Sequence, residues 1–179
     1  MIDTVETKRL VLRPIALDDV DLLVGLDSDP EVMRYLTGRP STREEVEVAV
    51  LNNMGCRWIA TERSSGAFVG WFSLVPEDDD SYFVGYRLAR EWWGRGFATE
   101  GTKALIDAAF TSLGARRSTA QTMAVNTRSR AVMERCGMRH TRTFHVEFED
   151  PLPGTEDGEV EYEITRDEWA RDRETGRET

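Results

Sequence analysis

The hydrophobic periodicity of this chain changes twice, and the change limits the folds that it can adopt. Three runs rich in aromatic and β-branched residues, at 57–61, 67–75 and 81–88, are separated by turn-forming Ser, Gly, Pro and Asp residues. Such runs predict three antiparallel strands in a meander. Directly after them, residues 97–113 carry apolar side chains at helical spacing and end at Gly114, a suitable left-handed helix cap. The chain therefore combines an antiparallel sheet with helices.

The remaining segments predict a mixed α/β or α+β architecture. Further strands are expected at residues 7–13, 118–125, 140–148 and 159–164, the last two as a hairpin. Further helices are expected after Asp18 and Asp19, at residues 30–36, from Ser41 to residue 51, and at 127–136. The helix at 97–113 and the strand and helix after it form a βαβα unit behind the meander.

Length and composition favour one soluble domain spanning residues 1–179. A chain of 179 residues with 40% hydrophobic and 31% charged residues has the balance of a globular protein. No apolar run exceeds four residues, so we expect no membrane span, and the first residues lack the apolar core of a secretory signal. A cytoplasmic location is expected, with residues from about 170 to 179 as a flexible tail.

The charge is unevenly distributed. The net charge of −10 argues against nonspecific nucleic-acid binding by the chain as a whole. Residues 147–179 hold 13 acids against 4 arginines, whereas residues 116–139 hold six arginines against one acid. We therefore expect the middle segment to attract an anion and the end of the chain to attract a cation.

Two glycines mark a candidate phosphate site. Gly94 and Gly96 lie between the strand expected at 81–88 and the helix expected at 97–113, where backbone N–H groups and a positive helix end can converge on an anion. Thr99 stands where a dinucleotide-binding G-x-G-x-x-G loop needs glycine, and no Gly-Lys-Ser/Thr follows for a P-loop. Taken alone, such a glycine pair is more often only a turn.

A second motif about thirty residues later makes the pattern specific. Residues 93–100 read Trp-Gly-Arg-Gly-Phe-Ala-Thr-Glu, and residues 125–138 read Val-Asn-Thr-Arg-Ser-Arg-Ala-Val-Met-Glu-Arg-Cys-Gly-Met. Together they resemble the GNAT acyl-CoA-dependent N-acyltransferases, in particular the Rim-type branch that acetylates N-termini of ribosomal proteins. The resemblance extends from the strand at residues 7–14 to residues 162–169. It implies a twisted, V-split, mostly antiparallel sheet of about seven strands flanked by helices.

The resemblance also implies acetyl-CoA as the acyl donor and no metal. In this family a loop of the form Gln/Arg-x-x-Gly-x-Gly/Ala binds the pyrophosphate of CoA, and Trp93 departs from it at the Gln/Arg position. The pantetheine arm is expected along the strand at 81–88, where Gly85 suits a bulge or a close backbone approach. The expected donor-binding residues are Arg87, Leu88, Trp93, Gly94, Arg95, Gly96, Phe97, Ala98, Thr99, Asn126, Ser129, Arg130 and Arg135. Arg128 can reach the same phosphates, although a solvated helix face is the other interpretation of these arginines.

The chemistry implied is direct attack by a neutral amine on the thioester, without a covalent acyl-enzyme. Cys56 and Cys136 have no partner resembling a catalytic dyad and are interpreted as core thiols. By resemblance, Ser129 donates a proton to the CoA sulfur and Asn126 holds the pantetheine, with helix capping as the alternative role of Asn126. A backbone N–H near residues 87–89 is expected to polarise the carbonyl.

The general base is expected in the strand at 140–148. There Phe144, Val146 and Phe148 share one face, and His145, Glu147 and Glu149 share the other. Glu147 is the first candidate, His145 is another, and a solvated surface position is the alternative for both. Glu100 fits the first turn of its helix, where its charge suits the dipole. Trp58, Trp71, Trp92 and Trp93 are interpreted as packing residues, since no basic stripe accompanies them.

Several functions stay open at this point. One alternative is a noncatalytic acyl-CoA-binding regulatory module. Another is the same chemistry with succinyl-CoA as donor or an aminoglycoside as acceptor. The acidic residues of the closing hairpin favour a cationic amine or a basic peptide as acceptor, and a homodimer is one option for the assembly.

Overall fold

A computed structural model describes residues 2–175 of the chain. The strands are β1 (Val5–Glu6), β2 (Leu10–Pro14), β3 (Arg57–Glu62), β4 (Phe68–Pro76), β5 (Ser81–Leu88), β6 (Arg117–Met123), β7 (Arg139–Phe144) and β8 (Glu159–Thr165). The helices are α1 (Val20–Asp27), α2 (Pro30–Met33), α3 (Arg43–Asn52), α4 (Phe97–Ser112), α5 (Thr127–Arg135) and α6 (Arg166–Thr175). Short 3₁₀ turns lie at Leu17–Asp19, Arg90–Trp92 and Thr155–Asp157.

The eight strands form one sheet in the order β1-β2-β3-β4-β5-β6-β8-β7. Every neighbouring pair is antiparallel except β5 and β6, which are parallel. The mixed, mostly antiparallel sheet flanked by helices confirms the expected fold class, with one strand more than the seven expected. The meander of β3, β4 and β5 lies close to the predicted bounds.

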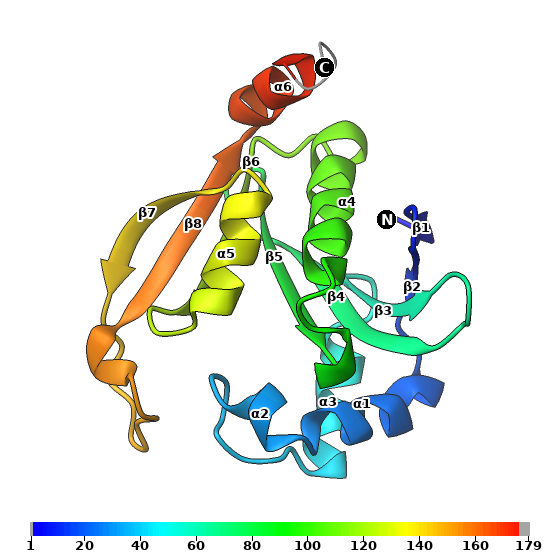
Figure 1. Ribbon diagram of the computed structural model, residues 1–179, viewed down its shortest axis with the longest axis vertical. Coiled ribbons are helices and arrows are strands. Elements are labelled where there is room, and N and C mark those ends of the chain that lie inside the picture. The colour runs from blue at the N-terminus through cyan, green and yellow to red at the C-terminus, as the bar shows by residue number, and fades with distance from the viewer. Residues whose placement is uncertain (1, 176–179) are drawn as a thin grey trace.

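The sheet splits between its two parallel strands. β5 and β6 pair only from Ser81 to Phe83 on β5, opposite Arg117 to Thr119 on β6. Beyond that point β5 continues to pair with β4, and β6 with β8. Figure 1 shows the two halves diverging towards the lower end of the view. The V-shaped split leaves one edge of β5 without a neighbouring strand.

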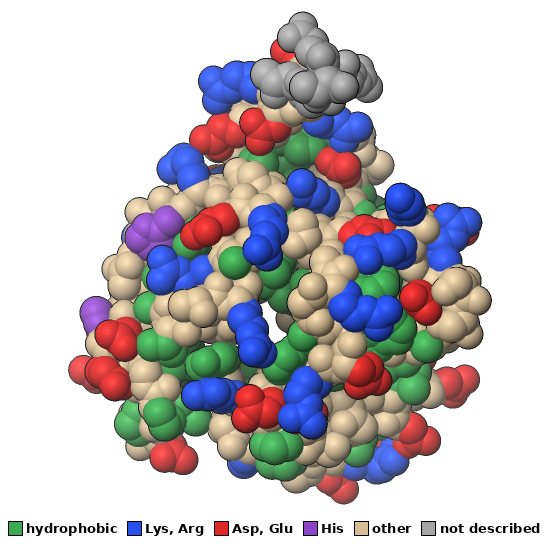
Figure 2. Space-filling view, viewed as in Figure 1, with side chains coloured by type: hydrophobic (Ala, Val, Ile, Leu, Met, Phe, Trp, Pro, Cys, Tyr) green, Lys and Arg blue, Asp and Glu red, His purple; other side chains and the backbone are tan. Residues whose placement is uncertain are grey.

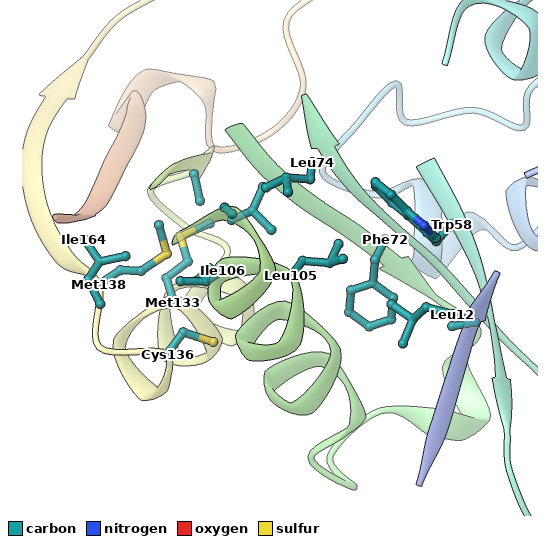
Figure 3. Close-up of a cluster of buried hydrophobic side chains, with 14 of the residues drawn as sticks. Leu12, Trp58, Phe72, Leu74, Leu105, Ile106, Met133, Cys136, Met138 and Ile164 are labelled. Atoms are coloured by element: carbon teal, nitrogen blue, oxygen red, sulfur yellow. The ribbon is translucent and has the colours of Figure 1, made fainter. Parts of the chain in front are cut away.

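Helices cover the two faces of the sheet separately. α4 and α5 lie side by side over one face (Figure 1), and α1 and α3 pack with Ile59 and Trp71 on the other. α4 spans the split, because Leu105 and Ile106 are buried in one cluster with residues of both halves. Figure 3 shows Phe72 and Trp58 on one side of α4, and a group from the other half of the molecule on the opposite side: Met133, Cys136, Met138 and Ile164. Within the described residues, no helix is both long and apolar enough to cross a bilayer.

The hairpin near the end of the chain is shorter than predicted. The strand expected at residues 140–148 ends at Phe144, because its partner β8 begins at Glu159, directly opposite Phe144. Residues 145–148 therefore have no strand to pair with, and the chain enters a loop that contains Pro151 and Pro153, which have no N–H to donate. The prediction that residues 144–149 alternate between two strand faces is wrong.

The chain also differs from prediction near both ends. The strand expected at 7–13 is divided into β1 and β2, because Thr7 turns the chain: its Oγ1 accepts the N–H of Leu10 at 2.8 Å. α3 is capped by Thr42 rather than Ser41, and Thr42 forms a reciprocal capping box with Glu45. The flexible tail expected from about residue 170 is helical as far as Thr175, and its last four residues lie outside the described part of the chain. Trp169 anchors this helix by donating a hydrogen bond to Asp107 on α4 at 2.6 Å.

Candidate functional site

The free edge of β5 offers unpaired backbone groups to the split. The N–H of Ala89 donates to Val69 on the β4 side. Because backbone groups alternate in direction along an antiparallel strand, Arg87 also pairs with β4, whereas Tyr86 and Leu88, beyond the last residue paired with β6, direct their N–H groups into the split. Trp93 donates its indole N–H to the carbonyl of Leu88 at 2.8 Å, so a side chain of the loop after β5 already occupies this carbonyl. Gly85 lies in unbroken register and is needed for close packing, since a Cβ there would lie 2.9 Å from Ser73 Oγ.

The loop after β5 leaves the first turn of α4 open. Gly94 and Gly96 have φ values of +70° and +82°, which favour glycine. Gly96 is the N-cap of α4 and supplies no side-chain cap. The N–H of Glu100 bonds to the carbonyl of Gly96, while those of Phe97, Ala98 and Thr99 have no acceptor among the described residues. Three free donors at the positive end of a helix can bind an anion.

Arginines surround this open helix end. Arg95 lies over the rings of Trp92 and Phe97, and Arg128 on α5 lies 5.3 Å from the ring centre of Trp93. Arg9 stacks on Phe97 and donates to the carbonyl of Arg95 at 2.9 Å. Neither Arg95 nor Arg128 is in an ion pair within the described residues. Figure 2 shows Lys and Arg side chains around a hollow in this face of the molecule.

Ser129 and Asn126 lie at the start of α5, as predicted, but their side chains have different roles. The side chain of Asn126 caps α5 by accepting the N–H of Ser129 at 3.3 Å, and it donates to Thr122 at 3.0 Å. Ser129 Oγ lies 2.8 Å from the hydroxyl of Tyr86, which comes from β5. The capping alternative for Asn126 therefore holds in this structure, and Ser129 is the residue at the split.

Tyr86 was missed by the sequence analysis. Burial raises the pKa of its hydroxyl to about 12, with only a partial opposing effect from the hydrogen bond to Ser129. The phenol therefore stays protonated at neutral pH and can donate to Ser129 Oγ, which frees the serine proton for another acceptor. The alternation of β5 puts Tyr86 on the same face as Val84 and Leu88, but only the folded structure shows that α5 covers that face.

Three of the predicted donor-binding side chains are occupied elsewhere or lie apart. Arg87 points to the opposite face of the sheet and binds Asp27 at 2.6 Å. Arg130 donates to the hydroxyl of Tyr162 and to the carbonyl of Ala124, at 3.1 Å each. Arg135 lines a separate groove with Lys103 and Trp169, beside α6. Of the other predicted residues, Leu88 lies on the free edge of β5, residues 93–99 form the loop and the open first turn of α4, and Asn126 and Ser129 lie at the start of α5.

The carboxylates of the closing hairpin are not placed as predicted. Glu147 is exposed in the loop after β7, so the strand argument for it as a base fails. On β8, Glu161 and Glu163 form ion pairs with Arg142 and Arg139. Glu159, the next carboxylate on the same face, has no side-chain partner among the described residues, and burial raises its pKa above the ordinary glutamate value. Sequence reasoning missed Glu159 because its strand partners could not be assigned.

The other candidate residues have structural roles. Burial raises the pKa of the Cys136 thiol to about 12, and it raises that of Cys56 as well, which suits core thiols and not nucleophiles. Burial alone would raise the pKa of Glu100, but hydrogen bonds from Thr7 and Arg9 hold it below the ordinary value. His145 is exposed and its ring nitrogen lies 3.2 Å from the carbonyl of Glu156. Within residues 2–175, no His, Cys, Asp and Glu cluster could hold a metal ion.

Comparison with known proteins gives close relatives. A model of the acetyltransferase (GNAT) domain matches residues 9–139. The FsC-acetyl coenzyme A-N(2)-transacetylase of Aspergillus fumigatus is 37% identical, and the match covers 94% of this chain and 78% of that protein. An uncharacterized N-acetyltransferase of Bacillus licheniformis is 33% identical over 71% of this chain and 77% of its own length.

Solved structures share the fold. A GNAT-family acetyltransferase from Bacillus anthracis superimposes with a TM-score of 0.79 at 24% identity, covering 92% of this chain and 99% of that one. The spermidine N-acetyltransferase of Vibrio cholerae, solved with CoA and spermine, superimposes with a TM-score of 0.77 at 19% identity, with the same shares covered.

Proposed function

Because the chain belongs to the GNAT acetyltransferase family and is an N-acetyltransferase, we propose that it transfers the acetyl group of acetyl-CoA to a primary amine by direct attack in a ternary complex. The observation that carries the proposal is the alignment of three features: the free edge of β5, the open start of α4, and Ser129 held by Tyr86. We place the reaction in the cytoplasm, where acetyl-CoA is available.

The open start of α4 fits the pyrophosphate of the donor. The free N–H groups of residues 97–99 supply hydrogen-bond donors, and Arg95 and Arg128, which form no ion pair within the described residues, supply positive charge. The N–H groups of Tyr86 and Leu88 along the split fit the amide groups of a pantetheine arm, because a strand edge binds an extended chain through backbone hydrogen bonds. A donor of this class contains an acetyl thioester, which an amine can attack without a covalent enzyme intermediate.

Ser129 is assigned to protonate the departing sulfur. In the transfer the amine nitrogen bonds to the acetyl carbon, the carbon–sulfur bond breaks, and the sulfur leaves as a thiolate. Ser129 Oγ gives its proton to that sulfur, while the hydroxyl of Tyr86 donates a hydrogen bond to Ser129 and stabilises the developing negative charge on it. Neither cysteine takes part.

Glu159, rather than Glu147, is assigned to accept the proton that the attacking amine loses. Its carboxylate lies at the start of β8, opposite Met123 at the end of β6, and therefore at the end of the sheet where α5 begins. The elevated pKa that burial gives it makes it a better proton acceptor than an exposed carboxylate. A partner arginine, such as those of Glu161 and Glu163, would weaken this basicity.

The acceptor is proposed to be an amine attracted by the β7–β8 loop, residues 145–158. This loop exposes several carboxylates that form no ion pair within the described residues: Glu147, Glu149, Asp150, Glu156 and Asp157. Their combined field concentrates protonated amines at the open end of the split. Both a protein N-terminus, as in the Rim-type branch, and a small cationic amine satisfy this requirement.

The proposal is tested by measuring free thiol released from acetyl-CoA together with mass-spectrometric detection of the acetylated amine. The assay uses purified full-length protein, a panel of peptides and small amines, and succinyl-CoA as the competing donor. Amine-dependent thiol release with an acetylated product supports the proposal. Release that is independent of the amine, or transfer from succinyl-CoA alone, contradicts it.

A further inference from the structure

Arg57, the first residue of β3, has a guanidinium without an acceptor. Its Nε is buried and makes no hydrogen bond, and no carboxylate in the described residues forms an ion pair with it. Its guanidinium lies over the ring of Trp71, whose centre is 4.1 Å from Cζ. Burial, and then the charge of Arg87, lower the pKa of Arg57 to about 10. A charge held partly out of water without a partner is costly, and such costs concentrate at binding sites.

A second guanidinium lies against the same tryptophan. Arg87 on β5 stacks on Trp71 at 5.2 Å and binds Asp27, the last residue of α1, at 2.6 Å. Asp27 also accepts a hydrogen bond from Ser41 at 3.2 Å. The cluster therefore holds two positive charges against one negative charge: the carboxylate of Asp27 forms its ion pair with Arg87 and also attracts Arg57, but makes no hydrogen bond to it. One positive charge, that of Arg57, is left for an external anion.

The cluster lies beside the proposed reaction site. Arg87 directly follows Tyr86 on β5, and their side chains leave opposite faces of the strand. Ser41 belongs to the loop between α2 and α3, and this loop meets the β7–β8 loop: a Cβ on Gly38 would lie 2.4 Å from Leu152. The arginine cluster is thus bordered by the edge of β5 on one side. On its other side lies the α2–α3 loop, which contacts the acidic β7–β8 loop.

We propose that Arg57 binds a carboxylate of the acceptor, so that the acceptor is a molecule with both an amine and a carboxylate, such as an amino acid, rather than a simple polyamine. This inference rests on the proposed acetyl transfer to an amine. The unbalanced charge is a single one, which matches a carboxylate better than a doubly charged phosphate. The planar guanidinium presents paired N–H donors in the geometry that a carboxylate accepts. The acidic loop attracts the amine, and Arg57 attracts the opposite end of the same molecule.

The first test compares acceptors that differ only in the carboxylate. Lysine is compared with lysinamide, and glycine with glycinamide, in wild type, Arg57→Gln, Arg57→Lys and a control. The control is Arg116→Gln, which removes an exposed arginine that forms no ion pair within residues 2–175. Wild type and Arg116→Gln are expected to favour the carboxylate form by about 10-fold or more in kcat/KM, the effect of one charge-assisted hydrogen bond. Arg57→Gln loses this preference, Arg57→Lys keeps part of it, and the KM for acetyl-CoA stays unchanged in all three variants.

A preference for the amides in wild type, or a carboxylate preference that survives in Arg57→Gln, overturns the inference.

The second test needs no turnover. The Nε–H resonance of Arg57, assigned by its loss in Arg57→Lys, is followed by NMR in CoA-saturated protein as acetate replaces chloride at constant ionic strength. We expect the Arg57 Nε–H resonance to shift with acetate concentration and to saturate. If chloride shifts this resonance as much as acetate does, there is no carboxylate-selective site at Arg57. If acetate saturates Arg57 while no amine is ever acetylated, the proposed function fails and the anion site stands. If amines are acetylated while Arg57 ignores acetate, the inference alone fails.

Discussion

The hydroxyl of Tyr86 lies 2.8 Å from Ser129 Oγ, which joins the middle sheet strand β5 to the first turn of α5 across the split. Because the pKa of Tyr86 is raised to about 12, the tyrosine keeps its proton at neutral pH and can donate it in a hydrogen bond to the serine. We therefore expect Ser129 to act as the proton donor, with the hydroxyl of Tyr86 stabilising the negative charge that Ser129 gains.

Replacing Ser129 with Ala should lower kcat by about 10- to 1000-fold, the range of ordinary proton-transfer catalysis, with little change in the KM for acetyl-CoA. The control is Thr127→Ala, which removes an exposed hydroxyl two residues earlier on α5. Steady-state kinetics measures both. Unchanged kcat with weakened acetyl-CoA binding would make Ser129 a binding residue instead of an acid.

Replacing Tyr86 with Phe removes one hydroxyl and keeps the ring that packs near Phe72. We expect kcat to fall by about 3- to 30-fold, less than for Ser129→Ala, because Tyr86 acts through the serine. In the double variant with Ser129→Ala the loss from Tyr86→Phe should disappear, since the two residues act as one unit. Losses that multiply in the double variant would show that the two hydroxyls work independently.

Replacing Glu159 with Gln should abolish the acid-side fall of the pH–rate profile and lower kcat/KM by about 10²- to 10⁴-fold. In wild type, activity should rise with pH as this carboxylate loses its proton, with an apparent pKa above the ordinary glutamate value, because burial raises it. The matched control is Glu147→Gln, an exposed loop carboxylate that should leave rate and profile unchanged. If Glu147→Gln lost the rate and the pH dependence while Glu159→Gln kept both, the general base would be Glu147.

Glu168 should make the stability of the domain depend on pH. Hydrogen bonds from Thr165, together with Arg139, lower its pKa to about 2. A carboxyl whose pKa is depressed on folding stabilises the protein above the unfolded value near 4.5, and loses that effect as pH falls towards 2. Glu168→Gln should therefore lower Tm by about 2–4 °C at pH 7, the shift that ~1 kcal/mol produces in a domain of this size. The difference should narrow between pH 4.5 and 2, while Asp167→Asn, an exposed neighbour, should show no such trend in calorimetry.

Much of the fold could be predicted from local sequence because the deciding signals are local. The alternating aromatic runs predict β3, β4 and β5, and the glycines at 94, 96 and 114 mark the ends of the loop and of α4. The extent of β7 could not be predicted, because it depends on where β8 begins, fifteen residues after β7 ends. The end of the chain was expected to be free, since its anchor, Asp107 on α4, is distant in sequence from Trp169.

The residues of the candidate site also fall into two groups: those that local sequence predicts and those that depend on contacts between distant elements. Residues 93–99 and Ser129 could be proposed from motifs, because local sequence signals mark the loop before α4 and the start of α5. Tyr86, Glu159 and Arg57 were not found, because their roles depend on which face of a strand meets which partner. Contacts between distant elements of the same kind engage the side chains of Arg87 and Arg130, which bind Asp27 and Tyr162.

The measurement that tests the account most directly is calorimetric titration of acetyl-CoA into wild type and Thr99→Glu. A negative side chain in the first turn suits the helix dipole, so α4 should remain folded, but it places a charge where the pyrophosphate is expected. The control, Thr111→Glu, adds the same charge near the other end of α4. The account predicts that wild type and Thr111→Glu bind acetyl-CoA with similar affinity and that Thr99→Glu binds it at least about 10-fold more weakly. Equal affinity for all three proteins would contradict a donor site at the start of α4.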